Sequence, residues 1–165
     1  MDYVQRSFER FMADEYGAAL AFARATSRDW SEAEDLTQDA FVAALRNWSE
    51  VARYERPDAF VRRVIANQQV SRVRRRVREF AKAHLVASNE STETELGDGA
   101  FWDAVQQLPM RQRQVIALHY VEDRSVSDIA AVLEIAEGTV KAHLHAARHA
   151  LARLLGDEID DEEGV

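Results

Sequence analysis

Apolar and polar positions follow a helical period along nearly the whole chain. In the N-terminal part, apolar residues recur at spacings of three and four from Phe8 to Ala23, which predicts a first helix. Ser31-Glu32-Ala33-Glu34 has the form of a capping box and predicts a second helix running to about Trp48. Pro57 predicts the start of a third helix. The polar run at residues 67–69 interrupts its apolar pattern and favours a kink or an element boundary there.

The C-terminal part has the pattern of a helix-turn-helix. Pro109 suits the first turn of a helix, a short amphipathic helix follows around Ile129, and residues 133–138 break the pattern. The last helix has an apolar stripe and an opposite face without acidic side chains. The stripe is Val140, Leu144, Ala147, Leu151 and Leu154, and the opposite face is Lys141, Ala142, His145, Arg148 and His149. A helix with one packed and one cationic face is what reading of the DNA major groove requires.

Composition predicts an all-α protein made of two small helical domains. The chain has 165 residues with only two prolines and six glycines. Residues 88–99 are polar, acidic and end in two glycines, which is typical of a flexible linker. We therefore expect an N-terminal domain at 1–83, an acidic linker at 84–99, a helix-turn-helix domain at 100–155 and an acidic tail at 156–165.

Several function classes are disfavoured. No cysteine is present, and no apolar run approaches the ~20 residues of a membrane span. The N-terminus lacks the apolar core of a signal peptide, so we expect a cytoplasmic protein without membrane insertion. No phosphate-binding loop or catalytic triad motif occurs, so we expect no enzyme activity, catalytic residue or cofactor. His145 and His149 are four residues apart but lack a third ligand, so we expect no metal site.

The charge is strongly segregated along the chain. The net charge is −8, yet residues 54–82 hold 9 basic and 3 acidic side chains. Seven arginines lie within seventeen residues: Arg62, Arg63, Arg72, Arg74, Arg75, Arg76 and Arg78. Clustered guanidinium groups repel one another unless anions lie nearby, and neutralising phosphates gives strong, salt-sensitive binding. We expect these arginines to share one nucleic-acid surface; the alternative is an ordinary solvated face.

The second predicted helix has two faces. Leu36, Ala40, Ala44 and Trp48 form an inward stripe, and Asp35, Gln38, Asp39, Val42 and Arg46 line another face. The second face is either solvated or a docking surface for a basic partner. Trp48, Tyr54 and Phe60 lie near the arginine cluster, where aromatic rings can stack on unpaired bases. Core packing is the competing role, and it is favoured for Trp48 and Phe60.

Three segments, in this order, resemble a bacterial RNA polymerase sigma factor of the extracytoplasmic-function (ECF) type. Residues 34–42 are similar to the family's region 2.2, residues 57–76 to regions 2.3–2.4, and residues 108–151 to region 4. The resemblance implies a dissociable subunit that brings core polymerase to the −10 and −35 promoter elements and helps to melt the DNA. The last segment also resembles LuxR-type regulators, so a stand-alone helix-turn-helix regulator is the alternative.

The resemblance assigns roles by position. Docking on the β′ clamp of core polymerase is implied for the second helix: Asp35, Leu36, Gln38, Asp39 and Phe41. The β flap is the other part of core polymerase that the resemblance implies as a partner. Contacts to the −10 element are implied for Arg62, Arg63, Asn67, Arg72, Arg74, Arg75 and Arg76. Contacts to the −35 element are implied for Thr139, Lys141, His143, His145 and Arg148. The implied partners are core polymerase and promoter DNA, and many relatives also have an anti-sigma protein.

Four positions depart from the family pattern. Phe60 stands where the family usually has Trp, and Ser71 where it usually has Asp, which predicts an atypical melting segment. Glu134 replaces the usual turn glycine, and a left-handed conformation there would cost about 1 kcal/mol. Ala136 replaces the usual Ser or Pro before the last helix, which loses a cap worth about 1 kcal/mol.

Overall fold

The computed structural model describes residues 7–83 and 99–156, which form eight α-helices and no strand within those ranges. The predicted all-α fold class is confirmed. The predicted linker and tail lie outside the described residues, apart from Gly99 and Gly156 at their edges. In chain order the helices are α1 (Phe8–Thr26), α2 (Trp30–Arg46), α3 (Trp48–Val51), α4 (Pro57–Ala83), α5 (Gly99–Val105), α6 (Met110–Tyr120), α7 (Val126–Leu133) and α8 (Glu137–Leu155).

The start of α2 differs from its sequence prediction by two residues. The N-cap is Asp29, whose Oδ1 accepts a hydrogen bond from the Glu32 backbone N–H at 2.7 Å. The Glu32 carboxylate accepts in turn from the backbone N–H of Arg28 at 3.4 Å. The predicted box at residues 31–34 is therefore wrong, because an aspartate two residues earlier caps the helix equally well.

Helix α4 is continuous from Pro57 to Ala83, so the kink or boundary considered at residues 67–69 does not occur. Gln69 is buried, and its side-chain nitrogen donates to Thr26 Oγ1 at 2.6 Å. Its side-chain oxygen accepts from Gln114 Nε2 at 2.9 Å. Gln69 thus belongs to a buried hydrogen-bond network that joins α1, α4 and α6 and satisfies its side chain, whereas Asn67 is exposed.

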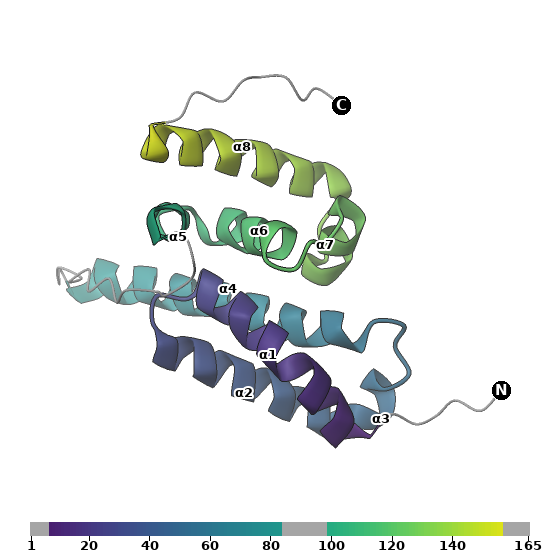
Figure 1. Ribbon diagram of the computed structural model, residues 1–165. Coiled ribbons are helices and arrows are strands. Elements are labelled where there is room, and N and C mark those ends of the chain that lie inside the picture. The colour runs from purple at the N-terminus through teal and green to yellow at the C-terminus, as the bar shows by residue number, and fades with distance from the viewer. Residues whose placement is uncertain (1–6, 84–98, 157–165) are drawn as a thin grey trace.

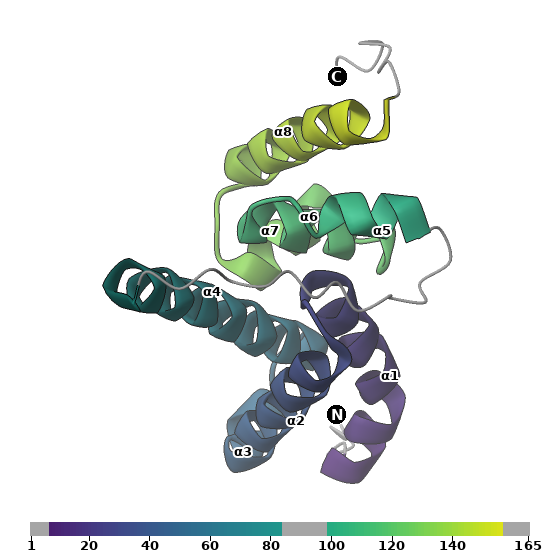
Figure 2. The ribbon, with the colours of Figure 1, turned by 90° about the vertical axis from the view of Figure 1, so that its left-hand side faces the viewer.

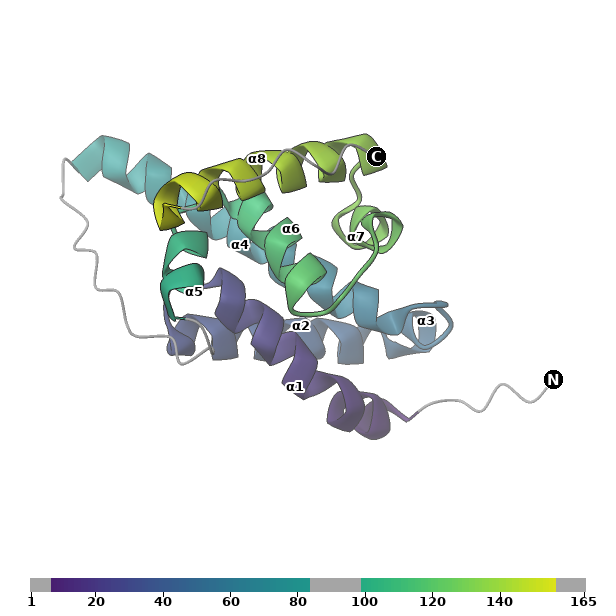
Figure 3. The same cartoon turned by 45° about the horizontal axis from the view of Figure 1, so that its top comes forward.

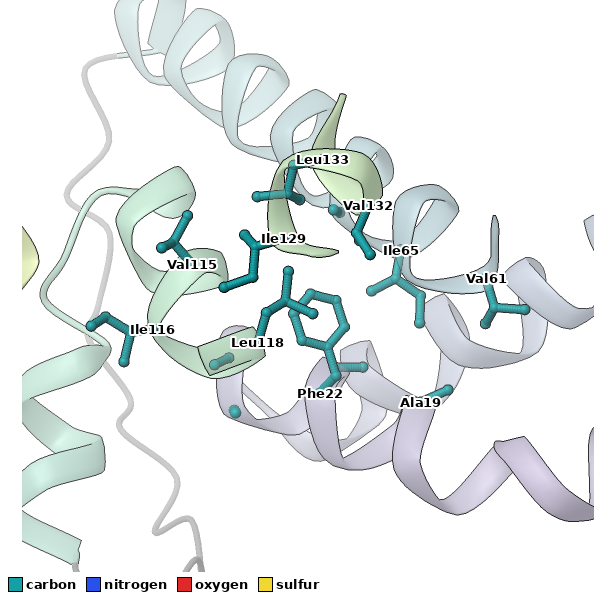
Figure 4. Packing of buried hydrophobic residues seen from close by; sticks show 14 of the residues in the cluster. Ala19, Phe22, Val61, Ile65, Val115, Ile116, Leu118, Ile129, Val132 and Leu133 are labelled. Atoms are coloured by element: carbon teal, nitrogen blue, oxygen red, sulfur yellow. The ribbon is translucent and has the colours of Figure 1, made fainter. Parts of the chain in front are cut away.

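The helices form two groups that pack directly on each other. In Figures 1 and 3, α1–α4 make one group, α8 lies on the opposite side, and α6 and α7 lie between them. Figure 4 shows the apolar contact between the groups, in which Phe22 of α1 and Ile65 of α4 meet Leu118 of α6 and Val132 of α7. One hydrophobic core therefore runs through both groups of helices.

Two positions of the predicted apolar stripes face solvent. Met12 in α1 is 37% exposed and Leu154 in α8 is 45% exposed, whereas their neighbours on the stripes, such as Phe11 and Leu151, are buried. Periodicity alone did not distinguish the edge of each stripe from its centre.

Within the described ranges, no helix combines the length and apolar character needed to cross a membrane.

Replacing Phe22 with alanine tests the shared core. Phe22 is fully buried at the contact between the two groups, so Phe22→Ala should lower the free energy of unfolding by about 3–5 kcal/mol. Urea denaturation followed by circular dichroism measures this change. Met12→Ala on the same helix is the control and should cost less than about 1 kcal/mol. Equal losses for the two variants would contradict the position of the core.

Candidate nucleic-acid interface

Helix α8 presents a cationic face to solvent. Its buried side chains are Val140, Leu144, Ala147 and Leu151, which pack on α5, α6 and α7. The predicted −35 residues Thr139, Lys141, His145 and Arg148 are all exposed, and His143 is half-buried. Figure 1 shows α8 as the outermost helix, on the side away from α1 and α2. The open face of α8 therefore carries four of the five predicted residues.

Neighbouring side chains orient the middle of this face. Arg148 Nε donates to the Tyr120 hydroxyl at 3.2 Å, and its Nη2 lies 3.4 Å from His119 Nε2. The rings of His145 and His149 lie together, with centroids 4.2 Å apart. Arg148 is thus held over the end of α6, which limits the directions in which its guanidinium group can point.

The turn before α8 has both features expected from the sequence. Glu134 is the C-cap of α7 and adopts a left-handed conformation with φ 55° and ψ 45°. Ala136 is the N-cap of α8 and makes no side-chain capping hydrogen bond. The carboxylate of Glu137 lies in the first turn, where the helix dipole favours a negative charge. The turn therefore keeps the helix-turn-helix geometry without the residues that usually stabilise it.

The end of α4 carries free guanidinium groups. Arg74, Arg75 and Arg78 are exposed and make no ion pair with another described residue, and Asn67 is also exposed. In Figure 2 the C-terminal half of α4 projects beyond the other helices. This projecting segment can reach an extended polyanion without rearrangement.

The middle of α4 is tied to α2 instead. Arg76 Nη2 lies 2.6 Å from Glu32 Oε1, and Arg72 Nη1 lies 3.7 Å from the same oxygen. Arg72 also approaches Asp39 Oδ2 at 4.0 Å. Both guanidinium groups remain partly exposed, so each of these two arginines contacts both the carboxylates of α2 and solvent.

The start of α4 is covered by the second group of helices. Arg62 is only 2% exposed and pairs with Glu15 at 3.0 Å and Glu122 at 2.8 Å. Arg63 donates to the backbone oxygens of Ala131 and Val132 at 2.9 and 3.1 Å. The expectation of one continuous arginine surface is therefore wrong for this conformation, because long-range ion pairs divide the cluster into three parts.

The predicted docking residues of α2 are also partly exposed and partly buried. Asp35, Gln38 and Asp39 are exposed, whereas Leu36 and Phe41 are buried and support the helix from within. Two exposed apolar side chains extend the exposed face along α2, namely Val42 and Leu45. The outward stripe of α2 is confirmed and combines carboxylates with apolar surface. The inward stripe is confirmed as far as Ala44, whereas Trp48 begins α3 and is partly buried.

The aromatic side chains near the arginines have mainly structural contacts. Trp48 packs against Phe8 and Phe11, with ring centroids 5.5 and 5.0 Å apart. Phe60 is partly buried against the core and lies 6.3 Å from the ring of Tyr54. Tyr54 is exposed, and its hydroxyl donates to Glu50 at 2.8 Å. The core role favoured for Trp48 and Phe60 is confirmed, which leaves Tyr54 as the exposed ring.

The sequence did not predict the buried side chains of Arg113, Gln114 and Arg124, nor that of Glu122, which is 8% exposed. Arg113 donates to the backbone oxygens of Thr26, Gln106 and Leu108, and burial lowers the pKa of its guanidinium group to about 10. The available signal was the position of Arg113 and Gln114 directly before the buried run 115–118.

Within the described residues, no group of three or more His, Cys, Asp or Glu side chains could hold a metal ion.

Together, the helix-turn-helix with its open cationic face and the projecting arginine-rich helix define an all-helical DNA-binding protein. Two family profiles match the chain, "Sigma-70 region 2" over residues 11–79 and "Sigma-70, region 4" over residues 98–151. The RNA polymerase sigma-E factor of Streptomyces avermitilis is 33% identical over 89% of this chain and 82% of its own length. The ECF RNA polymerase sigma factor SigM of Mycobacterium tuberculosis is 31% identical over 91% of this chain and 78% of its own.

Two solved structures of sigma factors are also similar to this chain. The sigma factor RpoE of Bartonella quintana, determined in complex with the anti-sigma factor NepR, matches with a TM-score of 0.75 and 27% identity. That match covers 92% of this chain and 98% of RpoE. CnrH, determined with the cytosolic domain of CnrY, matches with a TM-score of 0.64 and 25% identity over 93% of this chain and 90% of its own. The chain belongs to the ECF group of the sigma-70 family, which directs RNA polymerase to promoters in transcription initiation.

A serine at position 136 should stabilise the start of α8. Ala136 has the extended N-cap conformation but no side-chain acceptor, so Ala136→Ser should raise the free energy of unfolding by about 1 kcal/mol. Thermal and urea denaturation measure the change. Ala142→Ser, at an exposed position inside α8, is the control and should give no gain, because serine is a weaker helix former than alanine. A gain of the same size from the control would contradict the capping explanation.

Proposed function

We propose that three surfaces of this chain divide the work of a sigma factor. The exposed face of α8 contacts the −35 element through Thr139, Lys141, His145 and Arg148, with His143 at its edge. The observation that carries this assignment is that α8 is the second helix of a helix-turn-helix, packed along one side and cationic and open along the other.

The projecting part of α4 contacts the −10 element. Asn67, Arg74 and Arg75 are available in the described conformation, and Arg78 extends the same surface by one turn. Arg72 and Arg76 join them when phosphates replace Glu32 and Asp39 as their partners. Arg62 and Arg63 join only when the α6–α7 segment leaves α4. Tyr54 supplies an exposed ring near the start of α4 for an unpaired base.

The outward face of α2 binds core polymerase at the β′ clamp. Asp35, Gln38 and Asp39 supply the polar contacts, and Val42 and Leu45 supply apolar area. Leu36 and Phe41 act indirectly, by fixing α2 on α1 and α4. A face that mixes carboxylates with apolar side chains suits a basic, partly apolar partner surface.

The remaining assignments follow from this division. The N-terminal unit, residues 1–83, binds polymerase and the −10 element, and the C-terminal unit, residues 100–155, binds the −35 element and the β flap. The chain performs no bond chemistry and works in the cytoplasm with core polymerase. An anti-sigma protein is a further partner, by analogy with the complexes of RpoE and CnrH. A stand-alone LuxR-type regulator is disfavoured, because the region 2 match covers all of α2 and most of α1 and α4.

Reversing one charge on α2 tests the docking face. Asp39→Arg should weaken binding to purified core polymerase at least about tenfold, because it sets a cation against a basic partner surface. Pull-down and fluorescence titration with core polymerase measure this change. Asp14→Arg reverses an exposed carboxylate on α1 and should leave binding unchanged. Full binding by Asp39→Arg would remove α2 from the proposal.

Removing one cation from α8 tests the −35 assignment. Promoters are first found by mapping transcription start sites after overexpression, and the variants are then assayed by run-off transcription with core polymerase. Lys141→Ala should lower transcription about 5- to 150-fold, the usual range for a contact worth 1–3 kcal/mol. Arg153→Ala removes an exposed cation from the last turn of α8 and should have little effect. If both variants transcribe like the wild-type protein, the open face of α8 does not contact promoter DNA.

A further inference from the structure

We propose that a buried ion-pair network centred on Glu122 is a latch that closes α4 to DNA until the α6–α7 segment is drawn away. The latch consists of Arg62, Glu122, Arg124, Asp58 and Glu15. The competition with DNA rests on the proposed function, in which Arg62 and Arg63 contact the −10 element. The closed conformation itself rests only on contacts within the chain.

Glu122 connects the two groups of helices. It lies between α6 and α7, and its Oε1 accepts a hydrogen bond from Arg62 Nε of α4 at 2.8 Å. Its other oxygen, Oε2, accepts from Arg124 Nε. Arg124 then reaches back to α4, where its Nη2 donates to Asp58 Oδ2 at 2.7 Å. One carboxylate on the α6–α7 segment thus bonds α4 both directly and through Arg124.

The centre of the latch is shielded from water, whereas Glu15 and Asp58 at its ends are partly exposed. The side chains of Glu122 and Arg124 are each 8% exposed, and that of Arg62 is 2% exposed. Burial opposes the charge of Asp58, but Arg124 and Arg56 hold its pKa below the usual range, so the carboxylate stays ionised at neutral pH. Removing the Glu122 charge leaves Arg62 with only Glu15 and Arg124 with only Asp58, so the buried cations are less well compensated and the closed arrangement is disfavoured.

The adjacent contacts of Arg63 show why closure excludes DNA. Its guanidinium group donates to the backbone oxygens of Ala131 and Val132 at the end of α7 and lies 3.4 Å from the Glu134 carboxylate. Carbonyls at a helix C-terminus carry partial negative charge. The α7 end therefore gives Arg63 an anionic environment of the kind a phosphate would give, while Glu122 does the same for Arg62. Neither guanidinium group can serve both partners at once.

The coupling is reciprocal by thermodynamic necessity. DNA that needs Arg62 and Arg63 binds only the open form, so whatever opens the latch raises the affinity for DNA, and DNA favours opening. Glu122 lies outside the proposed polymerase and DNA contacts. Changing Glu122 therefore alters the latch without removing a contact that the proposal assigns to either partner.

A two-label fluorescence experiment on the full chain tests the latch. The chain has no cysteine, so Glu9→Cys in α1 and Arg153→Cys in α8, both at exposed positions, can be labelled as a donor–acceptor pair. In this background Glu122→Gln keeps the side-chain size and removes the charge. We expect a loss of energy-transfer efficiency, and at least about fivefold tighter binding to the non-template −10 strand of a mapped promoter.

Asp123→Asn is the matched control. It changes the net charge by the same amount one residue away, at an exposed position outside the ion pairs of the described residues. Asp123 has φ 52°, a conformation that asparagine also tolerates. Asp123→Asn should therefore leave both the energy transfer and the DNA affinity unchanged. An equal gain in DNA affinity from this control would overturn the proposal, because net charge alone would then explain the effect.

A second variant guards against a folding defect. Asp58→Asn breaks the latch from α4 and should also lower energy transfer, with helicity by circular dichroism retained. Unchanged energy transfer in both folded variants would overturn the latch. Lower energy transfer without tighter DNA binding would overturn the proposed competition between the latch and DNA. It would mean that Arg62 and Arg63 do not contact the −10 element.

Discussion

A buried arginine must be paired, and in this protein the pairing of Arg62 joins three parts of the chain. Its guanidinium group bonds Glu15 of α1 and Glu122 of the α6–α7 connection while its backbone belongs to α4. Around it, the apolar contact of Phe22, Ile65 and Leu118 closes a core common to both groups of helices. The apolar contact supplies much of the attraction, because it removes large side chains from water. The ion pairs select the alignment, since displacement of either carboxylate leaves the buried charge of Arg62 only partly compensated.

The same pairing limits how much cationic surface this anionic chain can offer to an anionic polymer. The net charge of −8 is compatible with DNA binding only if cations gather where DNA lies. Among the described residues, two regions gather exposed cations without rearrangement, namely the acid-free face of α8 and the projecting end of α4. Elsewhere on α4, Glu32, Glu122 and Glu134 neutralise arginines that the sequence alone presents as free. The cationic surface of this conformation is therefore smaller than the arginine count suggests.

The sequence predicted the elements better than their partners. Helical periodicity located α1, the helix-turn-helix and the two faces of α2, because those signals are local. The polar run at 67–69 gave the wrong expectation, because Gln69 is satisfied by Thr26 and Gln114, which are 43 and 45 residues away along the chain. The burial of Arg62 was missed for the same reason, since Glu15 and Glu122 lie 47 and 60 residues from it. No local pattern distinguishes an arginine that faces DNA from one that faces a distant carboxylate.

The positions of the three surfaces constrain how the protein can be activated. Helix α2 packs on α1, α3 and α4 and lies on the side of the molecule away from α8 (Figure 1). A polymerase surface that binds only the outward face of α2 therefore leaves Glu122 and its partners untouched. In the proposed latch, opening requires a second contact, one that binds the C-terminal unit more tightly when it has left α4. Binding at two points satisfies this condition, because the first contact raises the effective concentration for the second. A sigma factor held closed in this way would depend on both of its units meeting polymerase and DNA, and docking through α2 alone would leave Arg62 and Arg63 covered.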